Sequence, residues 1–102
     1  MQINNTATKT QNKVLFPLGR TFLTMGAEEA LDESNQQPQD FLALHQIGDW
    51  GLVCESDKKE NEFSLVNGFR LLSAYRTAND TKLWVITEAN RSSTTILLPS
   101  EY

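Results

Sequence analysis

Three short runs rich in β-branched and aromatic residues follow one another in the last third of the chain. They occupy residues 69–77, 81–88 and 93–98, and polar turn residues separate them. Asn79 and Asp80 fill the first gap and Asn90 the second, and gaps of this length are typical of hairpins. Residues of these types favour a pleated, half-buried surface. The pattern therefore predicts a three-stranded antiparallel meander, which Pro99 ends because proline cannot donate to a strand ladder.

Alternation within the runs predicts which strand is central. Leu83 and Val85 share one face of the middle run, and Trp84 and Ile86 share the other. Both faces are largely apolar, so we expect this strand to be covered on both sides. The first run carries polar residues on both of its faces, and we expect it to be half exposed.

Two short helices are predicted between residues 24 and 48. Thr24 is suited to be the N-cap of the first, and Pro38 suits the first position of the second, where its missing N–H costs nothing. Gly48 marks the end of the second helix. The first helix has a narrow apolar stripe, so we expect it to dock shallowly; the second has a wider one, made of Phe41, Leu42, Leu44 and His45.

A third helix is predicted from Ser56-Asp57, which supply its cap, to Asn67-Gly68, which end it. Phe63 and Val66 form its three-spaced apolar pair. A short strand over Arg20–Thr24 is a further candidate. The predicted fold class is therefore α+β, with about three short helices packed on a C-terminal three-stranded antiparallel meander and everything upstream covering one face of it.

Length and composition indicate one domain. A chain of 102 residues suits a single core, which we place at residues 13–102, after a flexible polar tail at residues 1–12. No apolar run approaches the length of a membrane span, and the N-terminus lacks the apolar segment of a signal peptide. The single cysteine, Cys54, cannot form an internal disulfide. These features together favour a cytoplasmic location.

The net charge of −4 conceals an uneven distribution. Residues 27–62 contain ten acidic residues against Lys58 and Lys59, whereas the rest of the chain has seven basic residues and three acidic ones. Such polarity can steer a partner. The plainer interpretation is a solvated helical surface, because exposed helix faces are normally charged.

Few side chains suggest chemistry, and each has a structural interpretation beside the functional one. His45, the only histidine, suits a general base, but late in a helix it also suits capping of carbonyl groups. Asp49 and Trp50 suit either a ligand ledge or a structural lock with a buried indole. Cys54 is a candidate thiol or a small apolar filler. No spacing indicates a metal site, so no metal or cofactor is expected.

The two most specific stretches are His45-Gln46-Ile47-Gly48-Asp49-Trp50-Gly51 and the strand Lys82-Leu83-Trp84-Val85-Ile86-Thr87-Glu88-Ala89. Over residues 16–102 the chain resembles a small family carried by bacterial plasmids, phages and other mobile elements, often labelled plasmid-related protein. It departs from that family at Met25, where the family tends to have proline, and at residues 52–54, where the family has an acidic stretch. The resemblance implies a mobile-element setting and no particular reaction.

The favoured hypothesis is a non-catalytic protein-binding accessory or regulatory protein of a mobile genetic element. It would bind a host or element-encoded protein through an acidic helical face, and one version is an inhibitor of a host defence system whose carboxylates mimic nucleic-acid phosphates. Neither a membrane nor nucleic acid is the expected partner. The proposed binding residues are Glu28, Glu29, Asp32, Glu33 and Asp40.

The alternative hypothesis is a ribonuclease toxin that acts on RNA. Basic and aromatic side chains on the meander suit an RNA-facing surface, and the order of helices then meander is similar to that of RelE-like toxins. Those toxins are strongly basic, however, and basic residues on edge strands also protect sheets from edge pairing. The residues of this alternative site are His45, Arg76, Lys82 and Arg91.

Overall fold

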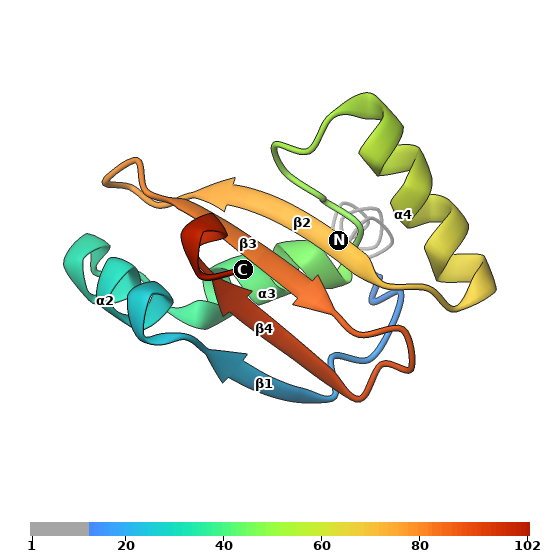
Figure 1. Ribbon diagram of the computed structural model, residues 1–102, viewed down its shortest axis with the longest axis horizontal. Coiled ribbons are helices and arrows are strands. Elements are labelled where there is room, and N and C mark those ends of the chain that lie inside the picture. The colour runs from blue at the N-terminus through green and yellow to red at the C-terminus, as the bar shows by residue number, and fades with distance from the viewer. Residues whose placement is uncertain (1–12) are drawn as a thin grey trace, which may run out of the picture.

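The computed structural model describes residues 13–102, and the flexible tail expected over residues 1–12 lies outside them. Three α-helices, four strands and one 3₁₀ turn follow in chain order (Figure 1). They are β1 (Arg20–Leu23), α2 (Met25–Ser34), α3 (Pro38–Gln46), α4 (Glu55–Asn67), β2 (Leu71–Arg76), β3 (Lys82–Thr87), β4 (Ser93–Leu97) and η1 (Pro99–Glu101).

The sheet has the strand order β1-β4-β3-β2. The antiparallel meander of β2, β3 and β4 is confirmed, and β3 is flanked on both sides. The candidate strand before the first helix is also confirmed, but it joins the same sheet and runs parallel to β4, with Thr21 beside Thr94. The expectation of a purely antiparallel three-stranded sheet is therefore wrong. Pairing of segments some seventy residues apart leaves no local signal in the sequence.

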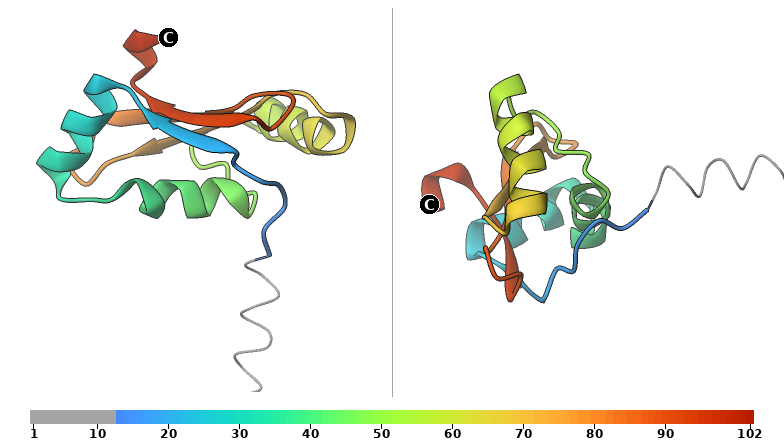
Figure 2. Two further views of the ribbon diagram at one scale, coloured as in Figure 1. Left: turned by 90° about the horizontal axis from the view of Figure 1, so that it is seen from below. Right: turned by 90° about the vertical axis from the view of Figure 1, so that its right-hand side faces the viewer.

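Two of the three α-helices, α2 and α3, cover one face of the sheet (Figure 2). η1 lies on the opposite side, and α4 lies beside the outer edge of β2. The expectation of three helices upstream packed on one face is thus wrong for α4, and the short η1 helix follows the meander. The main core cluster lies between the sheet and the two covering helices: Ala27, Ala30, Leu31, Phe41, Leu42, Tyr75, Leu83, Val85 and Ile96.

The predicted helix caps are mostly confirmed. Thr24 is extended and its Oγ1 accepts a hydrogen bond from the Ala27 amide at 3.2 Å, and Pro38 occupies the first turn of α3. Gly68 ends α4 in the left-handed conformation at φ 76°. The cap predicted at Ser56-Asp57 is wrong, because α4 begins earlier, at Glu55, and Cys54 precedes it without a side-chain cap.

Burial in α4 and β2 differs from the sequence pattern. Phe63 and Val66 are 54% and 84% exposed, while Asn61 and Ser64 are buried. The first meander strand is mostly buried rather than half exposed, because α4 and the loop before it close its outer edge. Among the described helices, none combines the length and apolar character that crossing a membrane requires.

Candidate functional site

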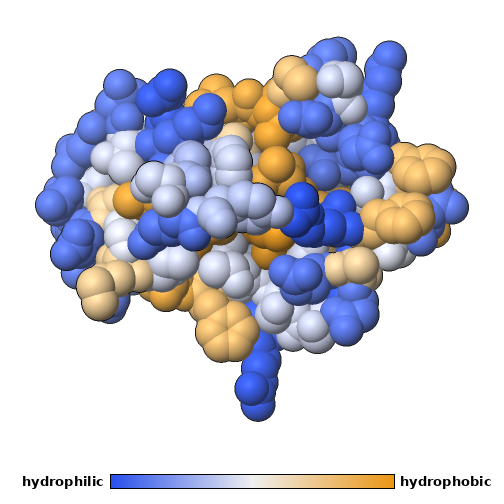
Figure 3. All heavy atoms as spheres, in the orientation of Figure 1, coloured by the Kyte–Doolittle hydropathy of each residue, from blue (hydrophilic) through white to orange (hydrophobic). Residues whose placement is uncertain are grey.

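Four carboxylates of the predicted acidic face lie together on the outer side of α2. Glu28, Glu29, Asp32 and Glu33 are all exposed, because Ala27, Ala30 and Leu31 occupy the inner side of the same helix. Figure 3 shows hydrophilic side chains gathered at the left end of the molecule, where α2 lies in Figure 1. We call these four residues the acidic face.

No cation in the described part of the chain neutralises the acidic face. The two ion pairs found within residues 13–102 join Lys58 to Glu55 at 4.0 Å and Arg76 to Asp80 at 3.5 Å. The fifth predicted residue, Asp40, is also exposed, but it lies in the first turn of α3, where its Oδ2 accepts a hydrogen bond from the Gln37 amide at 3.0 Å. Asp40 therefore has a capping role of its own.

Contacts at both ends fix the helix that carries the acidic face. At its start, Glu101 accepts hydrogen bonds from the Thr24 hydroxyl at 2.5 Å and from the Gly26 amide at 2.9 Å. At its end, Asn79 of the β2–β3 turn donates to the Glu33 carbonyl at 3.0 Å. The hydroxyl of Thr24, followed by the Leu98 amide, lowers the pKa of Glu101, so its charge persists to more acidic pH than usual. The four carboxylates are consequently presented on an anchored scaffold.

His45 is fully buried, so its ring has no contact with solvent. Its Nδ1 is 2.6 Å from the Ser73 hydroxyl and its Nε2 is 2.9 Å from the Thr87 hydroxyl. Burial, and secondarily the charge of Arg91, lowers the pKa of His45 to about 4. The interpretation of His45 as a cap of helix carbonyls is therefore wrong, since it bonds two strand hydroxyls as a neutral ring.

A chain of hydroxyl groups sets the proton positions around His45. Thr94 donates to the Leu18 carbonyl at 2.8 Å, so it must accept from Thr87, which lies 2.7 Å away. Thr87 has then used its only proton and accepts from Nε2–H of His45. Nδ1 is left to accept the proton of the Ser73 hydroxyl. The network is complete inside the protein and holds no proton poised toward solvent.

The basic residues of the alternative site are not brought together. Arg76 and Lys82 are register partners at one end of the β2–β3 pair, and both are exposed. Arg91 lies at the other end, in the β3–β4 turn, where its guanidinium donates to four backbone carbonyls at 2.7–3.2 Å. His45 is buried beneath the sheet. These four residues form no common cleft.

The Asp49-Trp50 turn is a structural lock, as one of its two interpretations predicts. Trp50 is buried, and its Nε1 donates to Glu62 at 3.0 Å. Asp49 accepts from the Gly51 amide through Oδ1 at 3.3 Å and from the Tyr75 hydroxyl through its carbonyl at 2.6 Å. Burial raises the pKa of Tyr75, consistent with its role as a neutral donor.

Cys54 is free and exposed, so its interpretation as a buried apolar filler is wrong. Its Sγ lies 3.2 Å from the Ser56 hydroxyl. No group of three or more metal-ligating side chains occurs among residues 13–102.

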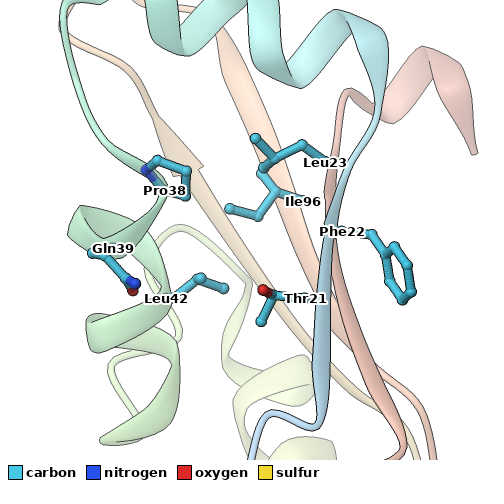
Figure 4. A pocket seen from close by; sticks show the side chains of 7 residues that line it. All are labelled: Thr21, Phe22, Leu23, Pro38, Gln39, Leu42 and Ile96. Atoms are coloured by element: carbon cyan, nitrogen blue, oxygen red, sulfur yellow. The ribbon is translucent and has the colours of Figure 1, made fainter.

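A groove of about 260 Å³, which the sequence pattern does not predict, lies between β1 and α3 (Figure 4). Pro38 and Leu42 form its helix side, while Thr21 and Leu23 form its strand side; Phe22 points away from it. The groove exists because β1 joins the sheet, and that pairing has no signal in the sequence.

The chain matches no family model, no curated protein and no solved structure. The resemblance to the plasmid-related family thus remains a prediction.

Proposed function

We propose that the protein is a non-catalytic accessory or regulatory protein that binds a basic surface of a partner protein through the acidic face. One observation carries this proposal: Glu28, Glu29, Asp32 and Glu33 project from one side of an anchored helix, and no cation in residues 13–102 pairs with them. Like charges held this close on a helix destabilise it modestly. A cationic partner would relieve that repulsion and would be steered toward the surface.

The chemistry of the acidic face also selects the class of partner. Four carboxylates repel phosphate, which disfavours nucleic acid and anionic membrane surfaces as ligands. A protein that normally binds nucleic acid has the complementary basic surface. In the mobile-element setting that the sequence resembles, such a partner would be a host defence protein, with the acidic face taking the place of nucleic-acid phosphates.

Neutralising the acidic face tests the proposal. We expect the variant Glu28→Gln/Glu29→Gln/Asp32→Asn/Glu33→Gln to keep the fold, since all four side chains are exposed. We expect wild-type protein to retain a host protein on a column, with retention falling as salt rises, and the variant to lose it. A matched control neutralises four exposed acids elsewhere: Glu55→Gln/Asp57→Asn/Glu60→Gln/Glu88→Gln. Equal recovery with the two variants would remove the acidic face from consideration.

The ribonuclease alternative has less support, because His45 is inaccessible and Arg91 is engaged with backbone carbonyls. It predicts growth arrest when the protein is expressed, with relief by Arg76→Ala/Lys82→Ala. Normal growth at high expression, together with loss of partner binding in the neutralised variant, is the result that our proposal predicts.

A further inference from the structure

The outer edge of β1 is unpaired within the described part of the chain. The Arg20 amide donates to the carbonyl of Ser92, just before β4, at 3.0 Å, and the Thr24 amide donates to the carbonyl of Ile96 in β4 at 3.1 Å. Since successive residues of a strand direct their amides to opposite sides, the backbone groups of Thr21 and Leu23 point away from the sheet. β1 is the lower border of the sheet in Figure 1, and no helix or strand lies beyond it.

The opposite edge of the sheet, formed by β2, is closed by backbone hydrogen bonds to the loop before α4. There, Ala74 of β2 donates to the Trp50 carbonyl at 3.1 Å and accepts from the Leu52 amide at 2.7 Å. Within residues 13–102, β1 has no such cover, and it contains neither a proline nor a bulge; of the usual protections of an edge strand it has only its length of four residues and the charge of Arg20. Its side chains are also apolar for an edge, with Phe22 49% and Leu23 38% exposed.

We propose that this edge is an interface for a second copy of the chain, with the two β1 strands antiparallel about a two-fold axis through Phe22. In that register Thr21 of each copy faces Leu23 of the other, and their outward amides and carbonyls form four hydrogen bonds. The two Phe22 rings meet across the axis, on the face of the sheet opposite α2 and α3. The result is one continuous eight-stranded sheet.

Charge complementarity supports this register. Arg20 lies opposite Thr24 of the second copy, which is still extended, at φ −74° and ψ 165°. The Thr24 hydroxyl donates a hydrogen bond to the Glu101 carboxylate, 2.5 Å away. Arg20 makes no ion pair within residues 13–102. The pairing therefore brings each unpaired guanidinium beside a fully exposed carboxylate, twice in the dimer.

The groove between β1 and α3 supplies a further fit. Leu23 of the second copy faces Thr21, and its side chain points to the same side of the sheet as the groove that Thr21, Pro38 and Leu42 line. The apolar side chain that an isolated copy exposes is thereby covered. The strands are short, however, so this contact is small beside the roughly 800 Å² per partner of a standard interface. We therefore expect a weak, concentration-dependent dimer.

Disulfide trapping tests the register directly. In a Cys54→Ser background, Phe22→Cys places two thiols across the axis, where facing Cα atoms are about 4.5 Å apart and within reach of a disulfide. Arg20→Cys is the matched control, because the two Arg20 positions lie four residues, or about 13 Å, apart. We expect a cross-linked dimer from Phe22→Cys alone. Equal trapping of both variants, or of neither, would overturn the proposal.

Sedimentation velocity over a concentration series tests the contacts. Thr21→Pro removes an outward amide but no bond to β4, so we expect the dimer dissociation constant to rise about tenfold while the Tm of the monomer is kept. Arg20→Glu should weaken the dimer similarly, and Lys59→Glu, an equal charge change on α4, should not. A wild-type chain that stays monomeric at all concentrations, or a dimer that these β1 variants leave unchanged, contradicts the proposal.

Discussion

The side-chain amide of Asn61 makes the two hydrogen bonds to Leu72 that a neighbouring strand would make. Its Nδ2 donates to the Leu72 carbonyl at 2.8 Å, and its Oδ1 accepts from the Leu72 amide at 3.1 Å. Two residues along β2, Ala74 bonds the loop before α4 in the same way. α4 therefore closes one edge of the sheet, which is why it lies beside the sheet and not over it.

Replacing Asn61 by alanine should destabilise the protein by about 2–3 kcal/mol, because both polar groups of Leu72 then lose a partner. Urea unfolding followed by circular dichroism measures the change. The control is Asn67→Ala, which removes the exposed bond from Asn67 to the Phe63 carbonyl at 2.9 Å and should change the free energy of unfolding by less than about 0.5 kcal/mol. Similar values for the two variants would show that edge closure adds no stability.

The lowered pKa of His45 predicts a specific loss of stability in acid. The unfolded chain takes up a proton near pH 6.5, while the folded protein does so only near pH 4. The contribution of His45 is therefore complete above pH 6.5 and is lost as the pH falls from 6.5 to 4, amounting to about 3 kcal/mol. Urea unfolding at several pH values measures it, and an NMR titration of the ring nitrogens should show a neutral imidazole at pH 5.5.

His45→Gln is the control for this pH dependence. Its amide can still bond the hydroxyls of Ser73 and Thr87, but it does not titrate, so the loss between pH 6.5 and 4 should disappear. The lowered pKa of Glu101 gives a loss of the same sign only below about pH 4.5, so most of the His45 window lies above it. A wild-type profile that is flat between pH 4 and 6.5 would contradict the buried neutral ring.

Most helices and strands of the fold could be predicted from local sequence patterns. The turn residues of the meander and the caps at Thr24, Pro38 and Gly68 were predictable because each acts on its immediate neighbours. The pairing of β1 with β4 could not be predicted, since no residue pattern in either segment indicates a partner about seventy residues away. The predicted class α+β is confirmed, but the arrangement of the helices around the sheet could not be predicted from the sequence.

The same distinction applies to the site. The exposure of the acidic face followed from helical spacing around Ala27 and Leu31, whereas the roles of polar residues in the interior did not. Asn61 and His45 are buried because strand groups elsewhere in the chain satisfy them. Phe63 and Val66 are exposed for the complementary reason, since α4 turns its polar side to the sheet edge.

We expect Arg91 to stabilise the fold through the shape of its guanidinium group, and a positive charge alone should not replace it. Its guanidinium donates to carbonyls of Ser64, Phe69, Glu88 and Ala89. An ammonium group cannot reach this spread of acceptors, so Arg91→Lys should lower the free energy of unfolding by about 1–2 kcal/mol. Arg76→Lys, at an exposed ion pair, should cost less than about 0.5 kcal/mol. Equal values for the two variants would leave Arg91 free for an RNA-binding role.

Two glycines, Gly51 and Gly68, have nearly the same φ but differ in how closely their neighbours pack. Alanine substitutions at the two positions therefore distinguish the cost of backbone strain from the cost of a steric clash. Gly51 has φ 75° and Gly68 has φ 76°, so alanine at either position incurs the same left-handed cost of about 1 kcal/mol. A Cβ at Gly68 meets nothing within 4 Å. At Gly51 it would lie 2.0 Å from the Ala74 carbonyl oxygen and 2.7 Å from the Tyr75 ring.

Gly51→Ala should therefore be more destabilising than Gly68→Ala by at least about 2 kcal/mol, because the bridge between Gly51 and Ala74 must open. Urea unfolding of both variants measures the difference. The fluorescence of Trp50, which is buried beside the bridge, should shift to longer wavelength in Gly51→Ala alone as its indole becomes hydrated. Equal destabilisation with an unchanged spectrum would mean that the loop can withdraw from β2 at no cost, and that the Asp49-Trp50 lock does not hold this edge.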